Sequence, residues 1–288
     1  MFRHAGQRVD HHVGRPQPGD ALFPDLEHPL WTVSALERDG RTAAMPELHG
    51  GQMLFSVAEF DSLYGRRRLA DVDMDRPVWE IPGPRDAVVR WHEAGLITGP
   101  VLDAGCGAGS NALWLAGQGY GVTGFDGSAS AVAQARSRAE AVGLTGIEFV
   151  QADAAALRLA GGYATVVDSA LYHCLAEPAR RAYLAGLRHA CLPGARLLMI
   201  CLSDALPRRL PGPFRITRDS LYETLPLEGW MIIGLRTGTI TIGFTADLIR
   251  RAISAMGLPD LRDGDVEFTA DGHALYPTWE VVAERRRV

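Results

Sequence analysis

The sequence predicts an α/β protein built on a doubly wound parallel sheet. From about residue 85 onward, short apolar runs typical of buried strands alternate with segments whose apolar residues recur at helical spacing. A glycine-rich turn joins the first of these strands to the helix that follows it. Because strand, helix and strand in succession form the unit of a parallel sheet, the alternation indicates one sheet with helices on both faces.

The expected elements follow one another along the chain. The predicted helices cover residues 85–94, 111–115, 128–142, 178–192, 218–225 and 246–256. The predicted strands begin at Val101 and then cover residues 121–125, 147–150, 163–168, 195–202, 230–235 and 274–284. Gly143 is expected to cap one helix, and Pro193-Gly194 is expected to end another.

Composition describes an ordinary globular chain and excludes some chemistry. The chain has 288 residues, of which 47% are hydrophobic and 22% charged, and its formal net charge is −5. This balance argues against a general binder of nucleic acid or of anionic membranes. All 29 basic residues are arginine, so Schiff-base chemistry on lysine and a Walker-type lysine are excluded.

The cysteines and the apolar runs predict the compartment. Cys106, Cys174, Cys191 and Cys201 show no metal-type spacing and are expected to be thiols in a reducing compartment. No apolar run approaches the roughly 18 residues of a membrane span, and the N-terminus lacks the apolar region of a signal peptide. We therefore expect a cytoplasmic protein without a metal site or a membrane partner.

The stretch from Val101 to Asp126, VLDAGCGAGSNALWLAGQGYGVTGFD, carries the ligand signal. Gly105, Gly107 and Gly109 follow the strand at alternate positions, where glycine permits unusual dihedrals and a close approach by a ligand. The carboxyl edge of an open α/β sheet is where ligands bind. The dinucleotide fingerprint G-x-G-x-x-G would place glycine at Ser110, whereas the spacing here is G-x-G-x-G.

With Asp103 before the glycines, the LDAGCGAG pattern resembles the first motif of class I S-adenosylmethionine-dependent methyltransferases. Phe60-Asp61-x-x-Tyr64 and Val78-Trp79-Glu80-Ile81-Pro82 resemble the entry segments of small-molecule members, such as the thiopurine, thiol and tellurite-resistance methyltransferases. The resemblance covers roughly residues 60–238 and the last strand. It implies a Rossmann-like sheet of seven strands, mostly parallel, whose last strand is antiparallel.

The resemblance also suggests a domain organisation. Residues 1–58 hold five of the nine histidines and show little periodicity, so we expect an N-terminal extension or lid there. A methyltransferase domain is expected over residues 59–288. By family analogy, residues 239–272 form an insertion that shapes the acceptor pocket.

The resemblance implies S-adenosylmethionine as cofactor and S-adenosylhomocysteine as product. Asp126 is expected to accept hydrogen bonds from the ribose hydroxyls, and Asp153 from the adenine amino group, with a helix N-cap as the alternative for Asp153. Trp79 is a candidate for a cation–π contact to the sulfonium, with core packing as the alternative. The expected cofactor-binding residues are Trp79, Asp103, Gly105, Cys106, Gly107, Gly109, Asn111, Asp126, Gly127, Ser128, Ala152, Asp153, Ala154 and Asp168.

The transferred methyl group is expected to point at the end of the fourth strand. His173 is the candidate general base there, because its ordinary pKa lies near neutrality, and Tyr172 is a second candidate for contact with substrate. Alternatively, this aromatic–histidine pair is only a wall beside the cofactor. The Asn/Asp-Pro-Pro-aromatic motif of DNA amino-methyltransferases and the Pro-Cys nucleophile of cytosine C5 enzymes are absent, which favours small-molecule acceptors over nucleic acid.

The predicted function is transfer of a methyl group to S, O or N of a small molecule by in-line displacement. In such a reaction, alignment and exclusion of water do most of the work. A nicotinamide-dependent oxidoreductase and a non-catalytic protein that binds S-adenosylmethionine are the alternatives. The acceptor atom and the oligomeric state stay open.

Overall fold

A computed structural model describes residues 47–49, 52–54, 56–66, 68–69, 72–73, 76–255 and 257–287. Most of the expected N-terminal extension, residues 1–58, lies outside these ranges, so its lid role stays a prediction. Among the described helices, none combines the length and apolarity needed to cross a membrane.

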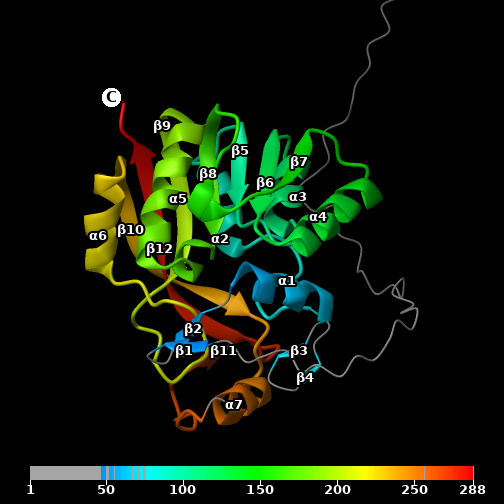
Figure 1. Cartoon of the computed structure of the whole chain (residues 1–288), viewed down its shortest axis with the longest axis vertical. Helices are drawn as coiled ribbons and strands as arrows, with labels where there is room; N and C mark the ends of the chain where they lie inside the picture. The colour runs from blue at the N-terminus through cyan, green and yellow to red at the C-terminus, as the bar shows by residue number, and fades with distance from the viewer. Residues whose placement is uncertain are drawn as a thin grey trace, which may run out of the picture. The chain divides into compact units, whose positions relative to one another are not determined.

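The main sheet has the strand order β10-β12-β9-β8-β5-β6-β7, and β11 pairs with β12 as well (Figure 1). β12 runs antiparallel to its neighbours, whereas β9, β8, β5, β6 and β7 pair in parallel. The strands are β5 (Val101–Ala104), β6 (Val122–Asp126), β7 (Ile147–Gln151), β8 (Tyr163–Ser169), β9 (Cys191–Leu202), β10 (Trp230–Ile242), β11 (Glu267–Phe268) and β12 (Ala274–Arg285). The predicted Rossmann-like sheet with an antiparallel last strand is confirmed, and β11 adds a short eighth strand.

Successive residues of a strand point to opposite faces of the sheet, and apolar residues lie on both faces. Helices therefore cover both faces. In β5, Val101 packs into one apolar cluster, and Leu102 packs into the other. The first cluster also takes side chains from α2 (Asp86–Glu93), α3 (Ser110–Gly117), α4 (Ala129–Ala141) and α7 (Ala246–Ala255). The second takes side chains from α5 (Glu177–Ala190) and α6 (Arg218–Leu227).

Helix α1 (Val57–Arg66) lies at the carboxyl ends of β5 and β6 (Figure 1). Asp61 docks it there: Oδ1 accepts hydrogen bonds from Ser128 Oγ at 2.7 Å and from Ser130 N–H at 2.9 Å. Ser128 also caps α4 by accepting from Ala131 N–H at 3.0 Å. The start of α4 and the position of α1 are therefore set by one group of side chains. Four short strands pair as two hairpins: β1 (Glu47–His49) with β2 (Gln52–Leu54), and β3 (Arg68–Leu69) with β4 (Val72–Asp73).

The structure corrects predicted boundaries of α5, β9 and β10. Helix α5 ends at Ala190, before Pro193-Gly194, and β9 begins at once with Cys191. Tyr163 pairs with Cys191, but Thr165 pairs with Arg196, so Pro193 and Gly194 lie in a bulge of β9. In a bulge the missing N–H of proline removes no hydrogen bond between the strands. Strand β10 extends beyond residue 235, because its pairing with β12 continues to Ile242. The start of the predicted insertion, residues 239–242, thus belongs to the sheet.

Candidate active site

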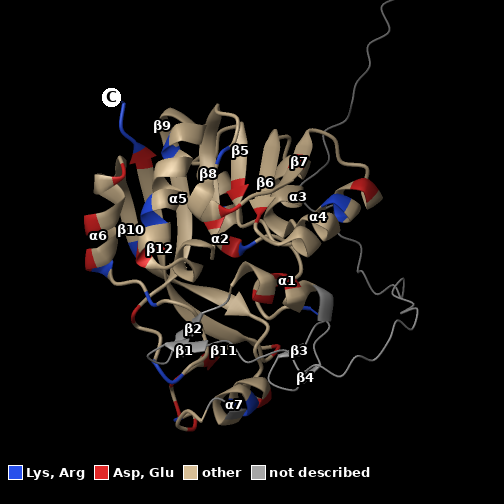
Figure 2. Cartoon of the chain, in the orientation of Figure 1, with Lys and Arg blue, Asp and Glu red and all other residues tan. Residues whose placement is uncertain are grey.

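A cavity of about 280 Å³ lies at the carboxyl edge of the sheet, close to the lower end of the roughly 300–1,000 Å³ typical of ligand pockets. The segments that follow β5, β6, β7 and β8 line this cavity. Helix α1, the loop before α2 and parts of β10 and β12 line it as well. Figure 2 shows acidic residues where the parallel strands end in this region.

Two of the three glycines of the motif line the cavity. Gly105 has a φ of 66° and Gly107 a φ of 55°, values that residues with a side chain rarely adopt. A Cβ at Gly105 would lie 2.8 Å from Leu171 Cβ, and one at Gly107 would lie 2.8 Å from the Tyr64 hydroxyl. Both the dihedrals of the turn and its packing against Leu171 and Tyr64 therefore require glycine at these two positions.

Asp126 holds this turn in place. Oδ2 accepts a hydrogen bond from Gly107 N–H at 2.9 Å, and Oδ1 accepts one from Ser128 N–H at 2.9 Å. Burial raises the pKa of Asp126, and these two N–H donors oppose that shift. The carboxylate lines the cavity together with Gly127 and Ser128. Its position at the end of β6 suits a ligand that carries neighbouring hydroxyls.

Asp153 and Ala154 also line the cavity, whereas Ala152 does not. Asp153 Oδ1 accepts from Ala155 N–H at 2.8 Å, so it caps the 3-10 turn Ala154–Ala156. The alternative of an N-cap is therefore confirmed, and it still leaves Asp153 on the cavity wall. Ala152 ties β7 to β6 through its N–H, which donates to Asp126 O at 3.0 Å.

Asp103 and Gly109 belong to the motif but do not line the cavity. Gly109 has a φ of 87°, and a Cβ there would meet Phe149 Cζ at 3.0 Å, so this glycine allows close packing of helix and strand. Both carboxylate oxygens of Asp103 are buried without a hydrogen bond of ordinary geometry among the described residues. Burial raises the pKa of Asp103 to about 7; the backbone N–H of Ala112 opposes this shift, and the charges of Asp168 and Asp126 add to it. The expected direct contacts of these two residues with cofactor are not supported by their positions.

Asp168 is also away from the cavity, and its carboxylate is fully used within the fold. Oδ1 accepts from Leu171 N–H at 2.9 Å and from Tyr172 N–H at 3.3 Å. Oδ2 accepts from the Tyr183 hydroxyl at 2.9 Å. Asp168 therefore braces the turn after β8 against α5, and its expected role as a direct cofactor ligand stays a prediction.

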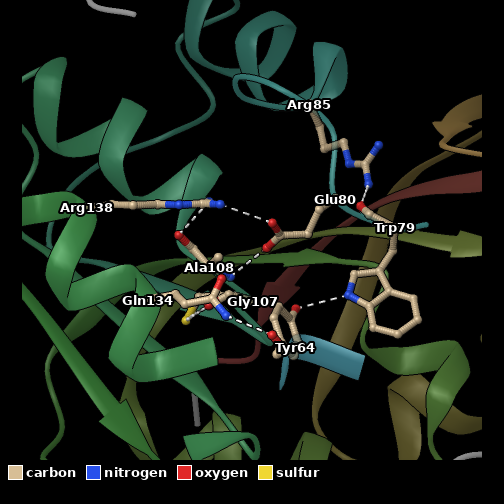
Figure 3. A network of polar contacts seen from close by, with 9 residues as sticks. Tyr64, Trp79, Glu80, Arg85, Gly107, Ala108, Gln134 and Arg138 are labelled. Atoms are coloured by element: carbon tan, nitrogen blue, oxygen red, sulfur yellow. Dashed lines mark hydrogen bonds and ion pairs between the residues drawn. The ribbon is translucent and has the colours of Figure 1, made fainter. Parts of the chain in front are cut away.

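A polar network closes the cavity on the side of the loop before α2 (Figure 3). Glu80 Oε1 accepts from Ala108 N–H at 3.0 Å, and Oε2 pairs with Arg138 Nη2 at 3.2 Å. Arg138 Nη1 donates to Ala108 O at 3.0 Å, so both backbone groups of Ala108 are bound. Asn111, which also lines the cavity, accepts from Arg85 N–H at 2.9 Å. The glycine turn is thus fixed from a second direction.

Trp79 lies on the cavity wall and also packs against the first apolar cluster. Its position is therefore compatible with both expected roles, contact with the cofactor and packing in the core. Its Nε1–H donates to the Tyr64 hydroxyl at 3.0 Å (Figure 3). Arg85 Nη2 donates to the carbonyl of Trp79. Cys106, next in the glycine turn, lines the cavity too, and burial raises the pKa of its thiol well above the ordinary range.

His173 lines the cavity, but its surroundings make it a weak base. Leu202 N–H donates to Nδ1 at 3.0 Å, so the neutral ring carries its proton on Nε2. Burial lowers the pKa of His173 to about 3, and the positive charge of Arg180 contributes. The lone pair of Nδ1 is engaged and the ring is weakly basic, which disfavours the predicted role as general base.

Tyr172 is not at the cavity. It is 1% exposed and lies in the second apolar cluster, with the Arg180 guanidinium 5.3 Å from its ring centroid. Of the predicted catalytic pair, the structure brings only His173 to the site. The reason is the short 3-10 turn Tyr172–Cys174, which points successive side chains to different sides.

The apolar wall of the cavity was not predicted from the sequence, apart from the entry motif and the expected role of residues 239–272. It comes from segments far apart in the chain, including Leu202, Pro211, Ile240, Ile242, Phe244 and Tyr276. Arg215 holds the loop that carries Pro211: its guanidinium donates to five carbonyls, those of Leu206, Pro207, Leu210, Gly212 and Pro213. No local motif signals such a wall.

Comparisons with known proteins agree with this geometry. A family model described as a methyltransferase domain matches residues 101–194. An uncharacterized methyltransferase from Schizosaccharomyces pombe is 31% identical over 105 residues, which cover 36% of this chain and 72% of the relative. A solved structure titled "Conversion of a Disulfide Bond into a Thioacetal Group during Echinomycin Biosynthesis" is 31% identical, covers 81% of this chain and 94% of its own, and has a TM-score of 0.65.

The chain belongs to the class I S-adenosylmethionine-dependent methyltransferases. This confirms the resemblance and the cofactor predicted from the glycine motif, and it does not favour the oxidoreductase alternative. A further relative, named 2-heptyl-1-hydroxyquinolin-4(1H)-one methyltransferase, comes from Mycobacteroides abscessus and is 33% identical over 150 residues. That match covers 51% of this methyltransferase and 66% of the relative, so the chain spans just under two thirds of the relative's length.

The unpaired carboxylate of Asp103 predicts how stability of the methyltransferase depends on pH. Its folded pKa of about 7 exceeds the ordinary value near 3.9, so its contribution favours folding at low pH and is lost as pH rises through about 7. We expect Asp103→Asn to stabilise the protein by about 2–4 kcal/mol at alkaline pH and to have little effect below the unfolded pKa. Chemical unfolding at both pH values measures this. A variant less stable than the parent at alkaline pH would contradict it.

The link between Glu80 and the glycine turn predicts a loss of cofactor affinity. We expect Glu80→Ala to weaken binding of S-adenosylhomocysteine about 3- to 30-fold, because Ala108 N–H loses a charged acceptor and the turn must be ordered on binding. Glu80→Gln keeps an acceptor and should lose less. Calorimetric titration measures both. Asp247→Ala, which removes an exposed ion pair with Arg251, is the control. Equal affinity in all three variants would reject the link.

Proposed function

We propose that this methyltransferase transfers a methyl group to an O, S or N atom of a small, apolar molecule by in-line displacement. The observation that carries the proposal is the contrast between the two sides of one cavity. One side is the glycine turn with the carboxylates of Asp126 and Asp153, and the other is an apolar wall. The first suits the cofactor, and the second suits an acceptor that is not highly charged.

The described residues fit the cofactor. Gly105 and Gly107 would hold its amino acid and ribose parts against bare backbone, Asp126 would accept from the ribose hydroxyls, and Asp153 from the adenine amino group. Trp79 would lie near the positive charge. When bound, S-adenosylmethionine supplies an electrophilic methyl group on a sulfonium. The chain itself contributes alignment of the nucleophile and exclusion of water by the apolar wall.

The names of two relatives support a small acceptor. The mycobacterial relative is named for a hydroxyquinolone, and the structure with 31% identity is titled for the conversion of a disulfide into a thioacetal. Oxygen and sulfur are therefore the acceptor atoms that these similarities favour. The apolar wall favours a small molecule over RNA or DNA, whose phosphates bind basic surfaces.

Two measurements test this function. Titration calorimetry should show binding of S-adenosylhomocysteine and none of NAD. A screen of phenols, thiols, amines and halides should then release S-adenosylhomocysteine with at least one class. Cofactor binding without turnover on any acceptor would instead support the non-catalytic alternative, and absence of cofactor binding would reject the proposal.

The proposed role of residues 239–272 in the acceptor pocket predicts a change in specificity. Phe244 is 4% exposed and lines the cavity just beyond β10. We expect Phe244→Leu to lower KM for bulky acceptors about 3- to 10-fold relative to small ones, because the shorter side chain enlarges this side by roughly the volume of a few methylene groups. Steady-state kinetics with a size series measures it. Affinity for S-adenosylhomocysteine should not change; a loss there would place Phe244 on the cofactor side.

A further inference from the structure

The ring of His173 offers a hydrogen-bond donor to the acceptor side of the cavity. Nδ1 is occupied by Leu202 N–H, so the remaining ring nitrogen, Nε2, carries the proton. His173 and Leu202 both line the cavity. A nitrogen that already holds its proton can donate to a ligand but has no lone pair with which to remove a proton from it. A reacting hydroxyl group therefore cannot lose its proton to this nitrogen.

Positive charge lies behind this part of the wall. The charge of Arg180 on α5 acts on His173, and the charge of Arg215 acts on Tyr276. Within the described ranges no carboxylate is in ion-pair distance of Arg215, and Arg180 pairs only with the half-exposed Glu177, at 3.6 Å. Two arginines with only one carboxylate partner between them among the described residues favour a negatively charged ligand on this part of the wall.

The wall also carries neutral hydroxyls. Ser169 and Tyr276 both line the cavity, and in the part of the chain that the structure describes their hydroxyl groups have no hydrogen-bond partner. Leaving a buried hydroxyl without a partner costs about 1–3 kcal/mol. Aromatic side chains, those of Phe60, Trp79 and Phe244, complete the lining. This aromatic lining matches a flat, apolar molecule.

We propose that His173 binds the acceptor through Nε2–H, and that the acceptor is an aromatic molecule with an acidic hydroxyl, taken up as its anion. The inference rests on the proposed methyl transfer and narrows its substrate class. An N–H group donates most strongly to an oxygen anion, which favours an acidic hydroxyl over a thiol or an amine. His173 is then a binding residue that selects the ionised acceptor.

The step balances without a protein base. The hydroxyl proton has left to solvent before binding. A lone pair of the oxygen anion forms the new C–O bond, while the bond between the methyl carbon and sulfur breaks and its electron pair stays on sulfur. The products are a neutral methyl ether and S-adenosylhomocysteine, so no proton passes to His173.

A binding experiment tests this without turnover. The protein is saturated with sinefungin, a cationic analogue of S-adenosylmethionine that cannot donate a methyl group, and 4-nitrophenol is added at a pH equal to its own pKa. We expect the visible band of the nitrophenolate to increase on binding, because the anion is the bound form. A decrease of this band, or binding with no change in it, would overturn the proposal.

Variants of His173 locate the contact. In His173→Asn, the amide oxygen can still accept from Leu202 N–H, but the Nε2–H donor is lost. We expect it to bind nitrophenolate about 10- to 100-fold more weakly, with thermal stability and sinefungin affinity close to the parent. His173→Gln, which keeps a longer-reaching N–H donor but cannot act as a base, should recover part of the affinity. His189→Asn, at an exposed histidine on α5, is the matched control. Equal affinity in His173→Asn and the parent would overturn the contact.

Kinetics separate this inference from the proposed function. Among acceptors that turn over, 4-nitrophenol should exceed unsubstituted phenol and thiophenol in kcat/KM. The His173→Asn change should raise KM for nitrophenol more than it lowers kcat. If His173→Asn lowers kcat/KM more for phenol, whose pKa is near 10, than for nitrophenol, then His173 acts as a base and the inference is wrong. Failure to bind cofactor rejects the proposed function. If cofactor binds but no acceptor is methylated, the nitrophenolate band still tests the binding of the acceptor anion.

Discussion

The site depends on a backbone turn that two carboxylates hold from opposite directions. Asp126 accepts from Gly107 N–H at 2.9 Å, and Glu80 accepts from Ala108 N–H at 3.0 Å. The turn uses left-handed backbone that only glycine adopts cheaply, so hydrogen bonds must hold it in one conformation. Because each carboxylate sits on a different segment, the turn, the end of β6 and the loop before α2 form one unit. A preformed turn lowers the cost of ordering when a nucleoside binds.

Charges of both signs lie around the cavity. Carboxylates lie at the glycine turn, and arginines act on His173 and Tyr276 in the wall. The proposed anionic acceptor would be attracted by both the sulfonium and the arginines, whereas the product S-adenosylhomocysteine has lost the sulfonium charge. The same field that assembles the reactants therefore weakens once the methyl group has moved.

The acids at the edge of the sheet have different roles because their surroundings differ. Asp126 lines the cavity and binds two N–H groups, Asp168 accepts three hydrogen bonds within the fold, and Asp103 is buried with none among the described residues. Their positions at strand ends look alike in sequence. An unpaired buried carboxylate is costly, so Asp103 reduces stability at high pH, whereas Asp168 recovers part of its burial cost by bracing the turn after β8.

The sequence by itself determined the alternation of strands and helices, the glycine turn and the nature of the cofactor. These are local: apolar periodicity follows from burial on one face, and the spacing of Gly105 and Gly107 follows from backbone geometry. Only the tertiary structure decided which side chains meet. Tyr172 is buried in the core, and Leu202 N–H fixes the proton of the neutral His173 ring on Nε2. The apolar wall of the cavity comes from β10, β12 and the loop after β9. Protonation and burial depend on contacts between residues distant in the chain, and no local pattern records those contacts.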